Sequence, residues 1–338
     1  MTADLLRATL AGQPTPRPPV WAMRQAGRWD PEFQRLRGQL DFFAFTQKPD
    51  LAAAASLLPR RFGVDAIILF YDITTLAVAM GLPFQMVPEA GPRPVTPIRS
   101  LADVDRLAPE PDPARYGFLL EVLDRVRREL AGALPILVFA GAPFTLASYC
   151  LGAGSDIAAT RRFAADQPQV WSRLLGRIET ATVSFIRTLA QNGADAWQLF
   201  DSWAGSLARE EYLAWAHPHH RSLFAALPEI PGILFVKEGP ELDLMAASGA
   251  QAVSLGTRHD LADALRQWPE LIFQGNVSDE LLRAGSPADV AAATRRCLEA
   301  GGGQRHIVNL SHGCDRATPV ANFQALVDTV RNWTGPSS

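Results

Sequence analysis

The sequence predicts an α/β protein built on a (β/α)8 barrel of the TIM type, with its active site at the carboxyl ends of the strands. Short runs rich in β-branched and aromatic residues recur eight times, and amphipathic segments follow most of them. This alternation is typical of a parallel sheet covered by helices. The chain has 338 residues, of which 48% are hydrophobic, so it can bury one large core. Eight units favour a closed barrel over an open, doubly wound sheet.

The expected strands are short and separated by helical segments. They cover Val20–Met23, Asp65–Phe70, Ile136–Phe139, Ala196–Phe200, Ile233–Val236, Ala252–Leu255, Leu271–Gln274 and His306–Leu310. Apolar residues recur with the helical period in the segments between them, which predicts helices at Tyr116–Leu130, Gln169–Gln191, Leu207–Ala226, Leu261–Trp268 and Ala288–Ala300. The pairs Ser286-Pro287 and Thr318-Pro319 combine an N-cap residue with a following proline, as at many helix starts.

One stretch departs from the regular alternation. The span from Tyr71 to Leu134 is too long for one plain strand–helix unit. Its proline-rich part, Pro83–Pro97, is expected to form an excursion over the barrel or extra strands. Neither a linker nor a low-complexity block interrupts the chain, so residues 1–338 are expected to form a single domain.

Composition and charge exclude several classes of protein. The formal net charge is -3, so no general basic field is present to attract nucleic acid or an anionic membrane. Apolar runs such as Ala66–Phe70 are far shorter than a membrane span. The three cysteines are scattered and odd in number, which argues against a disulfide framework and for a reducing compartment. We therefore expect a cytoplasmic protein without nucleic-acid or membrane partners.

Polar and small residues follow most of the expected strands. Because the carboxyl ends of barrel strands share one rim, these residues are expected to converge there. In chain order the residues are Arg24 and Arg28, Asp72, Tyr149, Ser202, Lys237 and His312.

Each of these residues also has a purely structural interpretation. Arg24 and Arg28 could pair with Asp30 and Glu32 on the surface. Asp72 and Ser202 could cap helices, which is the commoner role of such residues after a strand. Tyr149 could be a core tyrosine, and His312 a loop histidine. The position of all of them at the same end of successive strands favours a site.

The chain resembles the uroporphyrinogen decarboxylase family over nearly its whole length. The resemblance rests on the order and spacing of six motifs, "PVWAMRQAGR", "RRFGVDAIILFYDI", "FAGAPFTLASY", "GADAWQLFDSWAG", "FQGN" and "NLSHG". It implies a distorted (β/α)8 barrel, a homodimer and an enzyme without cofactor or metal. The reaction it implies converts the four acetate arms of uroporphyrinogen III to methyl groups, giving coproporphyrinogen III and carbon dioxide.

The resemblance also assigns roles to residues. Arg24 and Asp72 are the implied catalytic residues, and Asp72 meets the pyrrole NH groups. The implied substrate-binding residues are Arg24, Gln25, Ala26, Gly27, Arg28, Phe43, Asp72, Tyr149, Ser202 and His312.

The chain departs from the usual family pattern at four places. Relatives usually carry Tyr-Leu or Tyr-Met after the second arginine, Asp-Trp after the sixth strand, Asp-Pro soon after Gly-Asn, and glycine before the last histidine. This chain has Trp29-Asp30, Gly256-Thr257, Ser278-Asp279 and Ser311. None of the changes removes an implied catalytic group.

The proposed chemistry explains the residue types. A substrate with eight carboxylates needs cations that stay charged and match the carboxylate fork, which arginine does and lysine does less well. Decarboxylation needs an electron sink, and a pyrrole ring protonated beside the acetate supplies its own. A buried carboxylate such as Asp72 can stabilise that cationic ring. The proton donor stays open among Arg24, Tyr149, His312 and a held water.

Two other functions are weighed against this one. Zinc-dependent cobalamin:thiol methyltransferases need a His-x-Cys pair and a later cysteine. Here the fifth strand ends in Lys237-Glu238, and no cysteine follows Cys314. The cluster His217-Pro218-His219-His220 is interpreted as a solvated helix end. A non-catalytic tetrapyrrole-binding protein would need the cations but would have little need for Asp72.

Overall fold

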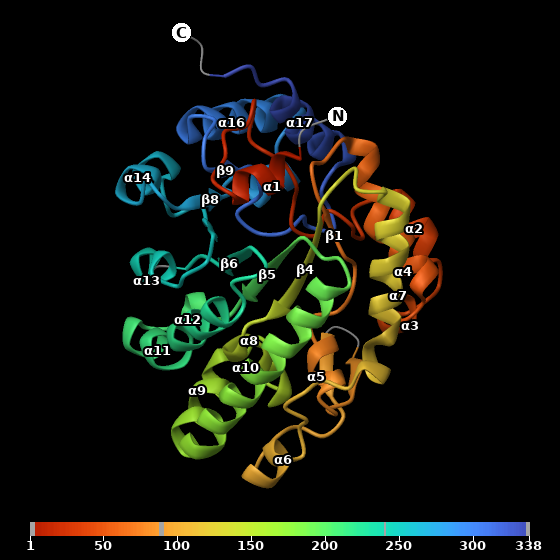
Figure 1. The fold of residues 1–338 in the computed structure, drawn as a ribbon, viewed down its shortest axis with the longest axis vertical. Coiled ribbons are helices and arrows are strands. Elements are labelled where there is room, and N and C mark those ends of the chain that lie inside the picture. Colours follow the sequence, from red (N-terminus) through yellow and green to blue (C-terminus); the bar gives the residue numbers. More distant parts are fainter. Residues whose placement is uncertain (1–3, 88–90, 240, 336–338) are drawn as a thin grey trace.

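A curled parallel β-sheet of seven strands forms the centre of the molecule, in a computed structural model that describes residues 4–87, 91–239 and 241–335 (Figure 1). The strand order is β1-β4-β5-β6-β7-β8-β9, and every neighbouring pair is parallel. The strands are β1 (Ile67–Ile68), β4 (Ile136–Gly141), β5 (Ala196–Asp201), β6 (Gly232–Val236), β7 (Ala252–Ser254), β8 (Ile272–Gln274) and β9 (His306–Ile307). These seven lie within or close to seven of the eight predicted strands.

The first predicted strand, Val20–Met23, is not formed as a strand. Only Val20 makes a bridge, to Val308 after β9, and its carbonyl accepts a hydrogen bond from the Asp65 amide at 2.7 Å. The prolines Pro18 and Pro19 have no N–H to donate to a ladder. The Val20 amide donates to the Asp65 carboxylate at 2.8 Å instead of to a strand. The segment therefore bonds to both edges of the sheet without becoming a strand itself.

The proline-rich stretch forms extra strands, one of the two predicted alternatives. An antiparallel pair, β2 (Phe84–Val87) and β3 (Gly91–Pro94), makes a separate two-stranded sheet. The connection at residues 88–90 lies outside the described residues. Pro94 pairs with Phe84 at the open end of this hairpin, whose edges are free to accommodate proline.

Helices surround the sheet, most of them on the outer side of the curl (Figure 1). They are α1 (Leu5–Leu10), α2 (Pro31–Arg37), α3 (Phe42–Thr46), α4 (Pro49–Leu57), η1 (Leu58–Phe62), α5 (Thr75–Ala79), α6 (Leu101–Asp105), α7 (Pro113–Leu130), α8 (Pro143–Cys150), α9 (Ile157–Asp166), α10 (Pro168–Gln191), η2 (Ala204–Ser206), α11 (Arg209–Trp215), α12 (His217–Ala226), α13 (Leu242–Ala246), α14 (Leu261–Gln267), α15 (Asp279–Ala284), α16 (Pro287–Gly301) and α17 (Val320–Arg331).

Four of the five predicted helices form nearly as expected, as α7, α10, α14 and α16. The fifth, Leu207–Ala226, is wrong as one helix because it breaks at Ala216 into α11 and α12. Pro218 has no N–H to donate to the Ala214 carbonyl, so the helix cannot continue through it.

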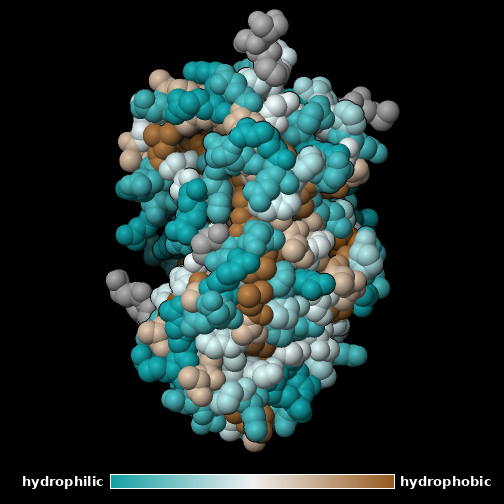
Figure 2. Space-filling view, turned by 90° about the vertical axis from the view of Figure 1, so that its left-hand side faces the viewer, coloured by the Kyte–Doolittle hydropathy of each residue, from teal (hydrophilic) through white to brown (hydrophobic). Residues whose placement is uncertain are grey.

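The side formed by α11 to α14 is mostly hydrophilic, with a narrow apolar band down its middle (Figure 2). No helix in the described part of the chain combines the length and apolarity needed to cross a bilayer.

Strand residues alternate between two cores. Ile67, Val138 and Leu234 pack outward against the helices, whereas Ile68, Leu137 and Ile233 pack inside the curl. Leu6 and Leu10 of α1 belong to the inner core. Arg7 of α1 pairs with Asp195, just before β5, so α1 covers the amino ends of the strands. The carboxyl ends are left for a site.

Candidate active site

Several of the predicted residues come together at the carboxyl ends of the strands. Burial raises the pKa of Tyr149, and the nearby Asp72 carboxylate raises it further. The positive charges of Arg24 and Arg93 oppose that rise in the pKa of Tyr149. Four segments therefore share one electrostatic environment: the loop with Arg24, the turn after β1 with Asp72, α8 with Tyr149, and the β2–β3 hairpin with Arg93.

The loop Arg24–Arg28 is held from below by buried amides. The Gln25 side chain is fully buried, accepting from the Ala22 amide at 3.1 Å and donating to the Ala66 carbonyl at 2.9 Å. The Met23 amide donates to the Asn309 side chain at 3.0 Å. Gln25 thus ties the loop to the start of β1, and Ala26 is buried beside it.

The two arginines of the loop are exposed and carry no ion pair with a carboxylate of the described residues. Their expected surface partners are engaged elsewhere, since Asp30 pairs with Arg61 and Glu32 pairs with Arg35. Surface pairing of Arg24 and Arg28 with Asp30 and Glu32 is therefore wrong. Their charges stay available for a ligand.

Arg24 has an unusual backbone conformation. Its φ is 58°, in the left-handed region that costs a residue with a Cβ about 1–2 kcal/mol. Its side chain runs over Gly313, where an added Cβ would lie 2.5 Å from the Arg24 Cδ. Gly313 is therefore required for this close approach, and it places Arg24 beside His312.

Asp72 is half-buried just after β1. Burial raises its pKa, while hydrogen bonds from the Thr74 hydroxyl and amide oppose the rise. The Thr74 amide donates to Oδ1 at 2.8 Å, so Asp72 shapes the turn before α5 but is not its N-cap. The capping alternative therefore describes only part of its environment, because the same carboxylate also acts on Tyr149.

His312 lies on the loop after β9 and is half-buried. Burial lowers its pKa to about 4, and the charges of Arg24 and Lys237 lower it as well. The Asp279 carboxylate acts in the opposite direction. At neutral pH the imidazole is uncharged, so it can exchange hydrogen bonds with a ligand but is a poor proton donor.

Ser202 follows the last residue of β5, and the short helix η2 after it has no side-chain capping bond. The helix-capping alternative for Ser202 therefore does not hold. The neighbouring Gly205 lies against the end of β6, where an added Cβ would be 1.8 Å from the Lys237 carbonyl oxygen. Glycine alone fits at this contact between the two strand ends.

A buried hydrogen-bond network lies directly behind Ser202. The Asp201 carboxylate accepts from the Thr145 hydroxyl at 2.6 Å and bonds His220 Nε2 at 2.8 Å. His220 Nδ1 lies 3.2 Å from the Tyr212 hydroxyl. The Trp203 amide donates to the Thr145 hydroxyl at 3.2 Å. The network joins the end of β5 to α8, which carries Tyr149.

An aromatic floor lines the curl beneath these polar groups. The rings of Phe139 and Phe200 lie 5.4 Å apart, as do those of Phe200 and Phe235, and His312 lies 6.0 Å from Phe235. Phe139 and Phe200 are half-buried. These two residues were not predicted as part of the site, although their positions near the carboxyl ends of strands could have indicated it.

The departures from the family pattern have local explanations. Asp30 is fully buried, caps α2 and pairs with Arg61, so it adds no anion to the site. The space at Gly256 is taken by the Glu238 carboxylate, 2.8 Å from where a Cβ would lie. The Ser311 hydroxyl donates to Asp279 at 2.8 Å, which fixes the last loop to α15.

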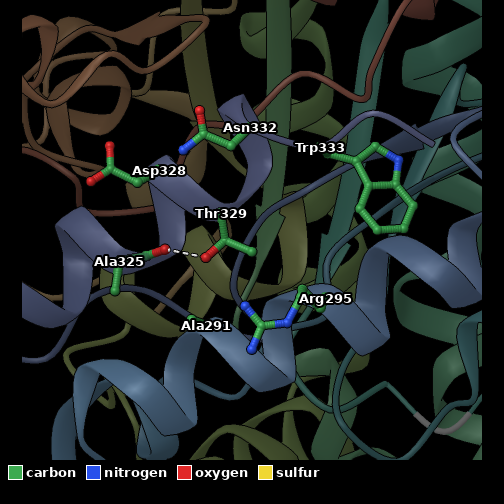
Figure 3. Close-up of a pocket in the computed structure, with 7 residues that line it drawn as sticks. All are labelled: Ala291, Arg295, Ala325, Asp328, Thr329, Asn332 and Trp333. Carbon is green, nitrogen blue, oxygen red and sulfur yellow. Dashed lines mark hydrogen bonds between the residues drawn. The ribbon is translucent and has the colours of Figure 1, made fainter. Parts of the chain in front are cut away.

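Two surface cavities lie in other places. One, of about 390 Å³, is formed between α16 and α17 and contains none of the predicted residues (Figure 3). The other, of about 500 Å³, is lined by Phe43, Asp41, Ala44, Gln47 and Met86. Phe43 therefore lies beside the β2–β3 hairpin, and its contact with substrate stays a prediction.

The described residues offer no geometry that supports the alternative of a zinc-dependent enzyme. No three histidine, cysteine or acidic side chains of this part of the chain are grouped as metal ligands. The interpretation of the histidine cluster as a solvated helix end is wrong, because His217 and His220 are buried. His219 bonds Glu179 and His220 bonds Asp201, so these two side chains have separate partners. Cys150, Cys297 and Cys314 are buried and unpaired.

These features define an α/β protein in which exposed arginines and the half-buried Asp72 carboxylate lie in loops at the carboxyl ends of a parallel sheet. The family model described as "Uroporphyrinogen decarboxylase (URO-D)" matches residues 1–333, and the chain belongs to this family. A uroporphyrinogen decarboxylase of Carboxydothermus hydrogenoformans is 37% identical over 336 residues, covering 96% of this chain and 94% of the relative. One of Alkalilimnicola ehrlichii is 37% identical over 341 residues, covering 97% and 93%.

Solved structures of other proteins share the fold. A methyltransferase from Methanosarcina mazei has a TM-score of 0.80 at 20% identity, covering 96% of this chain and 97% of that chain. A B12-independent methionine synthase from Shewanella sp. W3-18-1 has a TM-score of 0.58 at 13% identity, covering 95% and 94%. At these identities the similarity concerns the fold alone.

Proposed function

We propose that this chain is an enzyme that removes carbon dioxide from the four acetate arms of uroporphyrinogen III, giving coproporphyrinogen III. The observation that carries the proposal is that the charges of Arg24, Arg93 and the half-buried Asp72 all act on Tyr149, on a rim that also carries an aromatic floor. The named relatives support it, since they match nearly the full length at 37% identity.

Asp72 stabilises the charge that develops in the reaction. A proton adds to the pyrrole carbon beside the acetate arm and makes the ring cationic. Carbon dioxide then leaves, its bonding electrons neutralise the ring, and a second proton converts the exocyclic methylene to a methyl group. As the ring carbon loses its added proton, each arm consumes one proton net. Because burial disfavours the Asp72 carboxylate in the empty site, a cation formed next to it is strongly stabilised.

The other residues bind and orient the macrocycle. The exposed Arg24 and Arg28 bind side-chain carboxylates, and the partly exposed rings of Phe139 and Phe200 contact the ring face. Burial keeps Tyr149 protonated, so it acts as a hydrogen-bond donor. Ser202, His312 and Phe43 complete the proposed contacts.

Further properties of the family are carried over as proposals. Residues 1–338 form one domain, and Val20–Met23 occupies the eighth position of a closed barrel. The bridge from Val20 to Val308 and its bond to Asp65 support this closure. The enzyme acts without cofactor as a cytoplasmic homodimer, and the three unpaired cysteines support a reducing compartment. Sedimentation equilibrium at twice the 36.7 kDa chain mass tests the dimer.

Anaerobic incubation with uroporphyrinogen III, followed by chromatography of the oxidised products, tests the function. Stepwise loss of four carboxylates supports the proposal. An unchanged octacarboxylate that co-elutes with the protein supports a non-catalytic tetrapyrrole-binding protein instead. An unchanged substrate together with stoichiometric zinc in the purified protein favours the methyltransferase alternative.

A further inference from the structure

The pair Trp29-Asp30, where the chain departs from its relatives, lies under the arginine loop. Trp29 is 5% exposed and Asp30 is fully buried. Neither side chain therefore faces the site, and both are placed to act on the loop from behind.

The Trp29 indole makes one directed contact with the loop. Its Nε1–H donates to the Arg24 carbonyl oxygen at 3.1 Å. Arg24 is the loop residue with the left-handed backbone, which residues other than glycine seldom adopt without restraint. The indole therefore bonds the peptide group that leaves the strained residue.

Gly27 fits into the same contact. An added Cβ there would lie 3.2 Å from the Arg24 carbonyl oxygen and 3.5 Å from the Trp29 ring. A side chain at position 27 would therefore press on the Arg24 carbonyl group, which accepts the hydrogen bond from Trp29.

Trp29 is itself fixed by two separate elements. Its ring lies 5.6 Å from Phe62 of η1 and 4.6 Å from Phe323 of α17. The Arg61 guanidinium lies 4.2 Å over the Phe62 ring and also pairs with Asp30. The indole therefore joins the loop to η1 and α17.

Burial alone does not explain the hydrogen bond. Trp171 of α10 is 2% exposed, yet its indole nitrogen has no hydrogen-bond partner among the described residues. A buried indole in this fold can thus lack a hydrogen-bond acceptor. The bond from Trp29 therefore depends on the position of its indole next to the Arg24 carbonyl oxygen.

From these contacts we infer that Trp29 is a positioning residue, which holds the left-handed backbone of Arg24 so that its guanidinium meets a substrate carboxylate. This role rests on the proposed function, because it gives Arg24 a carboxylate to bind. The restraint of the loop backbone itself can be measured without substrate.

The test compares Trp29→Phe with the matched control Trp171→Phe. Trp29→Phe keeps an aromatic ring between Phe62 and Phe323 but removes the N–H donor. We expect amide hydrogen exchange in residues 22–30 to accelerate at least ~10-fold, and KM for uroporphyrinogen III to rise ~5–20-fold, with kcat within ~3-fold. The control should change neither quantity, and the two melting temperatures should fall by similar amounts.

Gly27→Ala provides a second route if Trp29→Phe does not fold. Its added methyl group presses on the Arg24 carbonyl without altering the Trp29 side chain, so the same faster exchange and higher KM are expected. Unchanged exchange of residues 22–30 in a folded variant would overturn the inference whatever the activity. If the wild-type protein is inactive on uroporphyrinogen III but Trp29→Phe still accelerates exchange of residues 22–30, only the proposed function is overturned. The inference about the loop backbone then stands.

Discussion

Two sides of the site hold their charges in opposite ways. On the first loop, Arg24 and Arg28 are exposed and have no carboxylate partner among the described residues. On the wall behind Ser202, Asp201 and His220 are fully buried and bonded to each other at 2.8 Å. The wall also supplies each of them with a further hydrogen bond, from Thr145 and Tyr212 respectively.

This difference separates binding from positioning. An exposed cation is solvated and costs little when unpaired, so it remains free to exchange water for a ligand carboxylate. A buried charge without a partner is costly, so the wall must satisfy its own groups. The exposed charges of the loop therefore suit its proposed role in binding, whereas the bonds of the wall hold β5 to α8.

The largest effect is expected from Arg24→Ala. Removing a charge-assisted contact to a substrate carboxylate should lower kcat/KM by ~10³-fold. Because Arg24 has no ion pair to lose, the free energy of unfolding should stay within ~0.5 kcal/mol of the wild type. Steady-state kinetics and denaturant unfolding measure the two quantities.

Arg266→Ala is the matched control for that variant. Arg266 lies on α14, far along the chain, and pairs only with Asp263 on the same helix among the described residues. Its removal should leave kcat/KM unchanged. An equal loss of activity in both variants would contradict a specific role for Arg24.

A smaller effect, this time on stability, is expected from His220→Phe. The change leaves the buried Asp201 carboxylate without its partner, which should cost about 3 kcal/mol of unfolding free energy. The neighbouring His219→Ala breaks a half-exposed pair with Glu179 and should cost less than ~1 kcal/mol. Urea unfolding measures both losses of unfolding free energy. Equal losses in the two variants would contradict the claim that the buried Asp201–His220 pair matters more for stability than the more exposed Glu179–His219 pair.

The smallest effect is a change in the titration of His312. The positive charge of Arg24 disfavours the protonated imidazole and helps to lower its pKa to about 4. Arg24→Ala should therefore raise the pKa of His312 toward its ordinary value of 6.5, while burial and Lys237 still hold it below that value. NMR titration of the His312 ring protons measures the shift, and no movement would place Arg24 away from His312.

The grouping of several candidate residues at one rim could be predicted from the sequence because most of them follow strands, while their roles stay predictions. Asp72, Tyr149 and His312 converge with Arg24 since parallel strands bring their carboxyl ends to one rim. The seven strands of the sheet were predictable for the same reason, from short apolar runs followed by helices.

What could not be predicted depends on contacts between distant residues. The pair Asp201–His220 depends on how α12 packs against the end of β5, which the sequence does not show, although Pro218 was a readable signal for the helix break before it. The segment at Val20 has the composition of a strand, but the Val20 amide donates to the Asp65 carboxylate and not to a neighbouring strand. The sequence also did not show that Asp30 pairs with Arg61, because these residues lie 31 positions apart in the chain.

The central claim is that the Asp72 carboxylate stabilises a cationic pyrrole ring. The most direct measurement is single-turnover decarboxylation of uroporphyrinogen III by Asp72→Asn, with binding affinity measured on the same preparation. Asparagine keeps an acceptor oxygen for the pyrrole NH groups but loses the negative charge. We expect a rate lower by ~10³-fold, with affinity within ~10-fold of the wild type. A folded Asp72→Asn protein with a rate within tenfold of the wild type would contradict it.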